Sequence, residues 1–372
     1  MMTRKELAQI RRRFIPEKND ISIIRGCFVN ENREIVSTFS KSPLSLPTSE
    51  AEHYLSVFKK TLGGAAGRNQ FSIAVDYNAP SGQLLRRLQS SALQDERAAQ
   101  DFFKTIIDGL EFEGSYLILA AFDTFSIPKK NSSVHTDAPD LSDNVFSYMI
   151  VSICPVKLTK PLLTFFSSDR NFHTVEPDLA VASPELGFMY PEFSNGGADV
   201  NAAHYYTRNI EDIHADFIDA VFAAQAPDSV ADTRQAFQDV LADSLDEKLT
   251  YEVVQTIHDN LVGQLTERKK DEGPLEVSRR EISSLLESCS VPKEKLAAFE
   301  KGYNETFGKG TGLAADTVIE AKKFEIEAGE AVKISVDPER SDLVEMKRID
   351  NRRAVIVYVE GDVTVNGVEV NI

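Results

Sequence analysis

The spacing of apolar residues changes twice along the chain, and this pattern narrows the possible folds more than any single motif does. Two stretches, SYLILAAFDTFSI (115–127) and VFSYMIVSICPV (145–156), are nearly continuous apolar runs of strand length. Such runs are typical of strands that are buried on both faces. From about residue 210 to 307 the apolar residues recur at helical spacing, whereas in the last fifty residues they alternate or run together as in strands. We therefore expect two β-containing parts separated by a helical part.

These spacings predict an α+β protein with three parts. Strands and helices are interleaved through residues 1–209, which indicates a mixed α/β domain. Residues 210–312 contain four or five amphipathic helical stretches with short polar joints, which predict an acidic helical segment. Residues 313–372 are expected to form a C-terminal antiparallel β-unit, in which Asn366-Gly367 is a strong hairpin-turn signal. The sequence leaves open whether this β-unit stands alone or completes the sheet of the first domain.

The net charge of −17 over 372 residues is unevenly distributed. Residues 211–316 contain 22 Asp and Glu against 11 Lys and Arg, so most of the negative surplus lies on the helical segment. A protein that binds nucleic acid gains much of its affinity from a basic surface laid against phosphates. Binding to an anionic lipid surface depends on basic residues in the same way. We therefore expect a protein partner or self-association, and neither nucleic acid nor a membrane.

A short basic helix is predicted at the N-terminus, beginning at the capping-box pair Thr3 and Glu6. Arg11, Arg12 and Arg13 close its last turn, where cations complement the helix dipole. A solvated helix end explains this triplet best. The alternative is a phosphate-binding patch, which would make the three arginines the binding residues of a nucleic-acid-associated protein.

The three cysteines, Cys27, Cys154 and Cys289, are odd in number and far apart. A disulfide framework or a zinc cluster needs cysteines in pairs at short spacing, so we expect free thiols and no metal. Cys154 ends an apolar strand, which favours an inert buried thiol over a nucleophile. The polar loop HTDAPDLSD (135–143) is better explained as a linker than as a metal site.

The glycine-rich stretch LGGAAGRNQ (62–70) follows a helical pattern and precedes a strand, which is the reverse of the order in a phosphate-binding loop. No cofactor is therefore expected. In a secretory signal an apolar run follows the basic residues, and the N-terminus of this sequence has no such run. No stretch approaches the roughly 20 apolar residues that cross a bilayer. Together with unpaired cysteines, these features predict a cytoplasmic protein.

The stretch SPELGFMYPEFSNGGADVNAAHYY (183–206) contains the best candidates for catalytic residues, namely Glu185, Asp199 and His204. Its aromatic residues would supply an apolar wall, and a carboxylate held against such a wall has a raised pKa that suits general acid–base chemistry. An acid–histidine pocket of this kind would belong to a hydrolytic enzyme.

Two further residues of this region, Tyr190 and Arg208, are candidate binding residues. Asp199, His204 and Arg208 would converge if a helix begins near residue 199. The alternative, which we favour, has Asp199 capping that helix and His204 packing along it. On this alternative the polar residues of the region finish turns and helices.

Several stretches resemble a bacterial protein family that is known only as a domain of unknown function and is found mainly in Gram-positive anaerobes. The resemblance is carried by ICPVKLTKP (153–161), SPELGFMYPEF (183–193) and AHYYTRN (203–209). It extends to IRRRFIPEKNDISIIRGCFVN (10–30) and to KLAAFEKGYNETFG (295–308), and so covers nearly the whole chain. The resemblance implies a full-length cytoplasmic bacterial protein, with no established activity or ligand to carry over.

The sequence therefore favours a non-catalytic binding or scaffolding protein, because it contains no recognised catalytic spacing. The first alternative is a hydrolytic enzyme that uses Glu185, Asp199 and His204. The second is a nucleic-acid-associated protein that uses the basic N-terminal helix.

Overall fold

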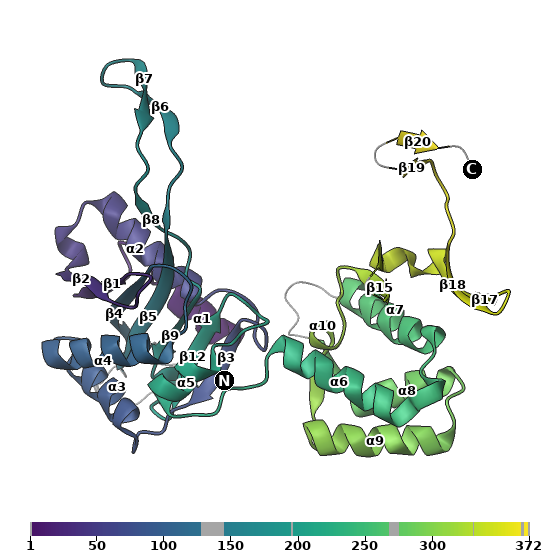
Figure 1. The fold of residues 1–372 in the computed structure, drawn as a ribbon. Coiled ribbons are helices and arrows are strands. Elements are labelled where there is room, and N and C mark those ends of the chain that lie inside the picture. Colours follow the sequence, from purple (N-terminus) through teal and green to yellow (C-terminus); the bar gives the residue numbers. More distant parts are fainter. Residues whose placement is uncertain are drawn as a thin grey trace, which may run out of the picture. The chain divides into compact units, whose positions relative to one another are not determined.

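The computed structural model describes residues 2–127, 145–194, 196–267, 275–329, 331–365 and 368–370. The chain divides into two compact units, Met1–Ser229 and Val230–Ile372, and each is described by itself. The elements of both units are labelled in Figure 1. The polar loop 135–143 and the expected Asn366-Gly367 turn lie outside the described residues.

The first unit is built on an eight-stranded sheet with the order β2-β1-β4-β5-β9-β12-β3, in which β8 pairs with the far end of β5. All of these pairings are antiparallel. The two apolar runs that the sequence predicted as strands are β4 and β5 at the centre of this sheet. The strands are β1 (Ile24–Val29), β2 (Ile35–Lys41), β3 (Gln70–Ala74), β4 (Tyr116–Ser126), β5 (Val145–Leu158), β8 (Leu179–Val181), β9 (Leu186–Tyr190) and β12 (Ala202–Thr207).

Helices cover both faces of this sheet, which explains why its central strands are apolar throughout (Figure 1). On one face, Ile150 of β5 packs in a core with Phe58 of α2 and Ile10 of α1. On the other face, Val151 packs in a second core with Phe102 of α4. The helices of the first unit are α1 (Arg4–Arg11), α2 (Thr48–Thr61), α3 (Pro80–Ser90), α4 (Glu96–Gly109) and α5 (Ala215–Phe222), with a short 3-10 helix at Pro43–Ser45.

Helix α5 extends the first unit beyond residue 209, where the sequence analysis places a domain boundary. Phe217 and Phe222 of α5 are buried against the sheet and contact Phe188 of β9. The compact unit therefore ends after Ser229, once α5 has closed the core.

The second unit begins with helices whose apolar faces share one core. The strand pair β13–β14 and the short helix α10 contribute to the same core through Val277, Leu313 and Val318. The elements are α6 (Val230–Leu245), a 3-10 helix (Asp246–Lys248), α7 (Tyr251–Glu267), β13 (Glu276–Ser278), α8 (Arg279–Ser288), α9 (Lys293–Phe307), β14 (Gly312–Ala314) and α10 (Ala315–Val318).

The C-terminal residues form three antiparallel strand pairs, each a separate two-stranded sheet. The strands of the eight-stranded sheet all come from residues 24–207. The C-terminal elements are β15 (Phe324–Ala328), β16 (Val332–Val336), the 3-10 helix η3 (Pro338–Leu343), β17 (Val344–Ile349), β18 (Arg352–Val357), β19 (Val363–Val365) and β20 (Val368–Val370). The fold class is α+β, as the sequence predicted.

Two small hairpins complete the first unit. One joins β10 (Glu192–Ser194) to β11 (Gly197–Asp199). The other joins β6 (Leu162–Phe166) to β7 (Asn171–Val175) at the end of an arm that leaves the sheet beyond β5 and β8 (Figure 1).

Candidate functional site

The predicted acid–histidine region is made of strands, so the expectation of a helix beginning near residue 199 is wrong. Residues 202–207 form β12, which pairs with β9 on one side and β3 on the other. Alternate residues of β12 therefore point to opposite faces of the sheet. Tyr205 lies in the core beneath α4 and α5, whereas His204 points to the opposite face.

The partner of His204 is Glu192, which the sequence analysis did not name. His204 Nδ1 lies 3.5 Å from Glu192 Oε1, and each side chain is only 1% exposed. The Met2 backbone N–H donates to Glu192 Oε1 at 2.8 Å, and the Ser72 hydroxyl donates to Oε2. Burial raises the pKa of Glu192, but His204 and these two donors outweigh burial and hold its pKa below the ordinary value of 4.5. The pair is therefore a polar contact inside the core, closed off from a substrate.

The register of the sheet places Glu185 far from the Glu192–His204 pair. His204 lies opposite Met189 of β9, and Glu185 precedes Met189 by four residues. At about 3.3 Å per residue, the two positions lie about 13 Å apart along the strand. Glu185 Oε2 instead forms an ion pair with Arg208 Nη2 at 2.8 Å. The three candidate catalytic residues therefore do not share one hydrogen-bond network.

Asp199 and Tyr190 both stabilise the local backbone. Asp199 lies opposite Glu192 in the β10–β11 hairpin, and its carboxylate accepts the backbone N–H of Asn201 at 3.0 Å. The Tyr190 hydroxyl donates to the carbonyl oxygen of Val200 at 3.0 Å, and its ring is buried. These contacts fix the turn that joins β11 to β12.

The arginine triplet is divided between surface and core. Arg13 binds the fully buried Asp123 of β4 through two nitrogen–oxygen contacts of 2.8 and 3.0 Å. The buried Tyr148 hydroxyl donates to the same carboxylate at 2.6 Å. Burial lowers the pKa of Arg13, but hydrogen bonds and attraction from Asp123 raise it above its ordinary value. Arg13 therefore anchors α1 to the sheet, while Arg11 is half-buried and Arg12 is exposed.

The three thiols are free. Burial raises the pKa of Cys27 to about 11 and that of Cys154 to about 12. At neutral pH both remain protonated and are poor nucleophiles.

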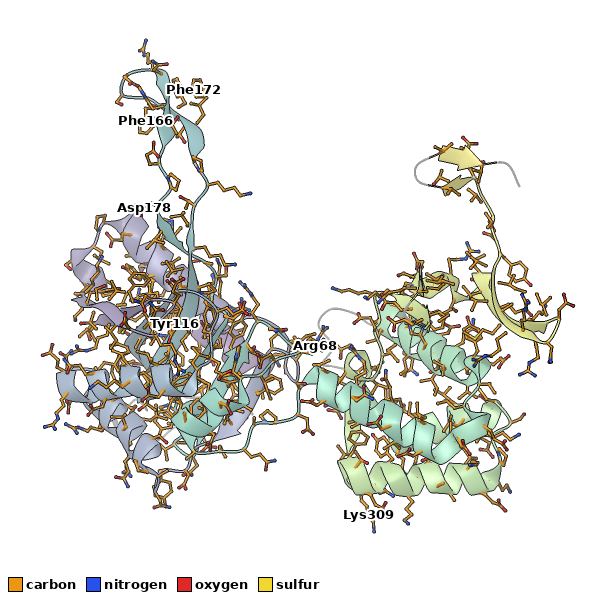
Figure 2. All side chains as sticks on the ribbon, viewed as in Figure 1. Arg68, Tyr116, Phe166, Phe172, Asp178 and Lys309 are labelled. Atoms are coloured by element: carbon orange, nitrogen blue, oxygen red, sulfur yellow. The ribbon has the colours of Figure 1, made fainter. Side chains whose placement is uncertain are left out.

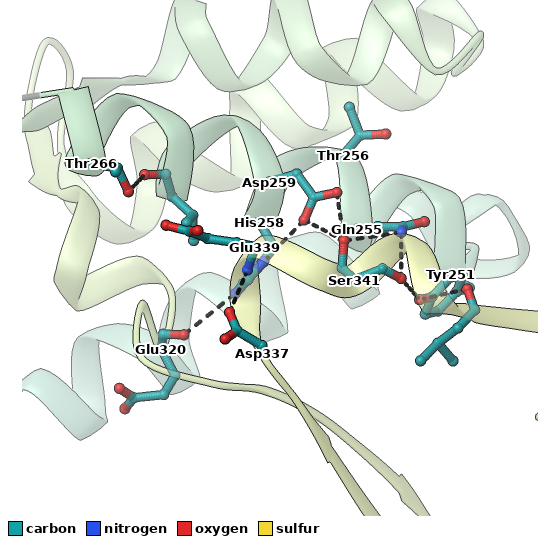
Figure 3. A network of polar contacts seen from close by, with 12 residues as sticks. Tyr251, Gln255, Thr256, His258, Asp259, Thr266, Glu320, Asp337, Glu339 and Ser341 are labelled. Atoms are coloured by element: carbon teal, nitrogen blue, oxygen red, sulfur yellow. Dashed lines mark hydrogen bonds and ion pairs between the residues drawn. The ribbon is translucent and has the colours of Figure 1, made fainter. Parts of the chain in front are cut away.

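In the second unit, a polar network joins α7 to η3 (Figure 3). The Ser341 hydroxyl donates to Asp259 at 2.8 Å, and Gln255 donates to the Ser341 carbonyl oxygen at 3.1 Å. His258 Nδ1 lies 3.3 Å from the same Asp259 carboxylate. A serine, an aspartate and a histidine thus occur together. In a catalytic triad the serine hydroxyl donates to the histidine that acts as general base, whereas Ser341 donates to Asp259. The network fixes η3 to the helix.

Residues 157–181 of the first unit form the arm, which projects from the sheet, and its described side chains do not pack in the cores of the unit. Its two strand pairs lie in the same register, with Val156 opposite Val181 at the base and Phe166 opposite Asn171 at the tip. In Figure 2, Phe166 and Phe172 lie near its end, and Asp178 lies nearer its base.

Apolar side chains on the arm are exposed. Phe165 and Phe172 lie opposite one another, with ring centroids 5.2 Å apart, and are 49% and 57% exposed. Leu163 on the same face is 70% exposed. Among the described side chains between 158 and 181, the exposed large apolar ones are Leu158, Leu163, Phe165, Phe166, Phe172, Leu179 and Val181. Exposed apolar patches of this kind are common at protein interaction sites.

A groove of about 740 Å³ lies at the base of the arm and is called the arm-base groove here. It runs between α2 residues 49–60 and the segment Val181–Ser183, where the arm re-enters the first unit. Leu117 and Leu119 of β4 line it with apolar side chains. Lys60 borders it and donates to the Ser183 hydroxyl at 3.0 Å. Its volume is in the range of ligand- and peptide-binding clefts.

Within the described ranges, no group of three or more His, Cys, Asp and Glu side chains is placed to hold a metal ion. Among the described residues, every helix is too short or too polar to cross a membrane.

The family called Domain of unknown function (DUF4317) matches residues 2–368 of the chain. The chain belongs to the DUF4317 family. This confirms the resemblance to a family of unknown function that the sequence stretches carried. No curated protein and no solved structure matches this DUF4317 chain.

Sequence reasoning missed the two features that matter most in this DUF4317 chain. Glu192 directly follows Pro191, and its burial depends on the pairing of β10 with β11 and on the position of Met2. The arm did leave a signal in the sequence. LLTFF (162–166) and NFHTV (171–175) are two β-rich runs separated by Ser-Ser-Asp-Arg, which is a hairpin pattern.

Proposed function

We propose that this DUF4317 protein is a non-catalytic binding protein and that its arm is the surface that contacts another protein. The observation that carries the proposal is the exposure of Phe165, Phe166 and Phe172 on a hairpin that projects from the sheet. A two-stranded hairpin alone is marginally stable in water. A partner protein that buries these rings would both stabilise the arm and gain binding free energy from the buried apolar surface.

The chemistry of the remaining polar groups supports binding rather than hydrolysis. The Glu192–His204 pair is enclosed, and Glu185 is directed to Arg208. Ser341 donates to an acid instead of to a histidine. A general base must lie within hydrogen-bond reach of the proton that it removes from a substrate.

We also place the protein in the cytoplasm, and the three free cysteines support this location. A nucleic-acid partner receives little support, because the net charge is −17 and Arg13 is committed to Asp123.

Photo-crosslinking in the cells that produce the protein tests the proposal. A benzoylphenylalanine in place of Phe172 would sit on the arm. The matched control is the same residue in place of Leu44, which is 91% exposed in the 3-10 helix before α2 and is remote in sequence from the arm.

We expect ultraviolet light to convert the Phe172 variant into one discrete species of higher mass, and to leave the Leu44 variant at the mass of the single chain. A Phe172 variant that gives no adduct, or gives the same smear as the Leu44 variant, would overturn the proposal.

A further inference from the structure

We propose that the occupant of the arm is a second copy of this chain. In this arrangement the two arms lie side by side and antiparallel, and the tip of each reaches the arm-base groove of the other. The inference rests on the proposed binding function of the arm and adds the identity and geometry of its partner.

The geometry of the arm favours this arrangement. The two strand pairs of the arm lie in the same register, from Val156–Val181 to Phe166–Asn171, with equal numbers of residues between them on the two sides. About ten residues separate the base of the arm from its tip, which corresponds to about 35 Å for extended chain. A twofold axis perpendicular to two such arms places each tip beside the base of the other, and the contact is then the same in both directions. The arm-base groove begins at Val181, at that base.

Charge also favours a second copy. The chain as a whole carries −17, but residues 157–181 contain three Lys and Arg and three Asp and Glu. The arm is therefore a neutral surface through which two acidic molecules can approach.

The exposed apolar residues of the arm lie on both of its faces, because alternate side chains of a strand point to opposite sides. Leu163, Phe165 and Phe172 share one face. At about 100 Å² for each side chain, that face supplies about 300 Å² for each copy, and about 600 Å² for two. Stable protein interfaces bury about 1,200–2,000 Å² in total, so the two arm-base grooves must contribute the remainder.

The apolar lining of the groove complements an aromatic tip. Leu117 and Leu119 line it, Val57 and Tyr54 of α2 border it, and Val181 joins it to the arm. A buried aromatic side chain in an apolar pocket is the usual centre of a protein interface.

Engineered disulfides between two differently tagged chains test the arrangement. One chain carries Ser168→Cys at the arm tip, and the other carries Ser56→Cys on α2 at the groove. Both carry Cys289→Ser, because Cys289 is the native thiol that is not buried. The matched control pairs Ser168→Cys with Ser90→Cys, an exposed position on α3, which belongs to the opposite layer of the first unit.

We expect a disulfide between the two tagged chains for Ser168→Cys with Ser56→Cys, and at least tenfold less for the control pair. We also expect the unmodified protein to be a dimer by sedimentation equilibrium. Replacing Phe165 and Phe172 by Ser should leave a folded monomer, whereas Leu44→Ser should leave the dimer unchanged.

Two results would overturn the inference. A dimer that crosslinks only between two Ser168→Cys tips excludes the antiparallel arrangement. A monomer at 100-fold above the cellular concentration excludes the second copy. In the latter case the proposed function still stands if the Phe172 photo-crosslink captures a different protein, so the two failures can be told apart.

Discussion

His204 of β12 and Glu192 of β10 are buried side by side, with Nδ1 and Oε1 3.5 Å apart and each side chain 1% exposed. The same carboxylate accepts a hydrogen bond from the backbone N–H of Met2, which lies 190 positions from Glu192 in the sequence. The pair therefore connects the N-terminal segment to the interior of the first unit.

Glu192→Gln should lower the free energy of unfolding by about 1–3 kcal/mol, because the donors around the carboxylate lose a charged acceptor in the core. Urea unfolding followed by circular dichroism measures the change. The control is Glu185→Gln, which removes an ion pair to the half-exposed Arg208 and should cost at most about 1 kcal/mol. Equal effects of the two substitutions would contradict the assignment of Glu192 as the core partner.

The stability that Glu192 contributes should depend on pH in the acidic range. Its pKa in the folded protein lies below the ordinary value of 4.5. The contribution is therefore complete above pH 4.5 and is lost as the pH falls through the folded pKa. In Glu192→Gln this loss should be absent, so the difference in stability between wild type and variant should shrink below pH 4.5. A difference that stays constant between pH 7 and pH 3 would contradict the prediction.

Arg13→Met should destabilise the first unit by about 3–5 kcal/mol, because it leaves the Asp123 carboxylate buried without a cation. Arg12→Met at the adjacent exposed position should change stability by no more than about 0.5 kcal/mol. The double variant Arg13→Met with Asp123→Asn should recover part of the loss, since no uncompensated charge remains. Chemical unfolding of the four proteins provides the comparison, and equal stability of the two single variants would count against a structural role for Arg13.

Gly187→Ala should cost about 1–3 kcal/mol through overpacking in the middle of the sheet. A Cβ atom at this position would lie 2.3 Å from the Val151 carbonyl oxygen and 2.7 Å from Thr61 Cγ2. Gly263→Ala in α7 is the matched control, because nothing lies within 4 Å of a Cβ atom there. It should stabilise the protein by about 0.5–1 kcal/mol through helix propensity. Thermal unfolding should therefore shift in opposite directions for the two substitutions.

A thiol reagent should distinguish the three cysteines. Cys27 and Cys154 are buried, with pKa values raised to about 11 and about 12, whereas Cys289 is partly exposed. Titration of the native protein at pH 8 with Ellman's reagent should therefore release one equivalent, and unfolding in guanidinium should release the other two. Rapid reaction of Cys154 in the folded protein would show that the strand is more accessible than the fold implies.

Part of this structure could be predicted from the sequence because it depends on local patterns. The apolar run at 145–156 predicts a strand buried on both faces, and Ile150 and Val151 do enter different cores. The capping-box pair Thr3 and Glu6 marks the start of α1. Such features follow from residues that are neighbours in the chain.

Features that depend on strand register could not be predicted in this way. His204 was assigned to a helix because Asp199, His204 and Arg208 have roughly helical spacing, but pairing with β9 and β3 makes the segment a strand. Its true partner, Glu192, is reached through two turns of the chain. The exposure of Phe172 was likewise invisible, because hydrophobicity alone does not distinguish a core strand from an arm.

The position of strand β5 in the sheet determines how the arm responds to a force applied by a bound partner. The strand is held between β4 and β9 in the middle of the sheet, and its last residues pair with β8 at the base of the arm. Because antiparallel hydrogen bonds lie perpendicular to the strands, tension along the arm would load those bonds in shear, together rather than one after another. The arm is thus attached to a central strand of the sheet. It should withstand a pulling force that would separate an edge strand from its neighbour.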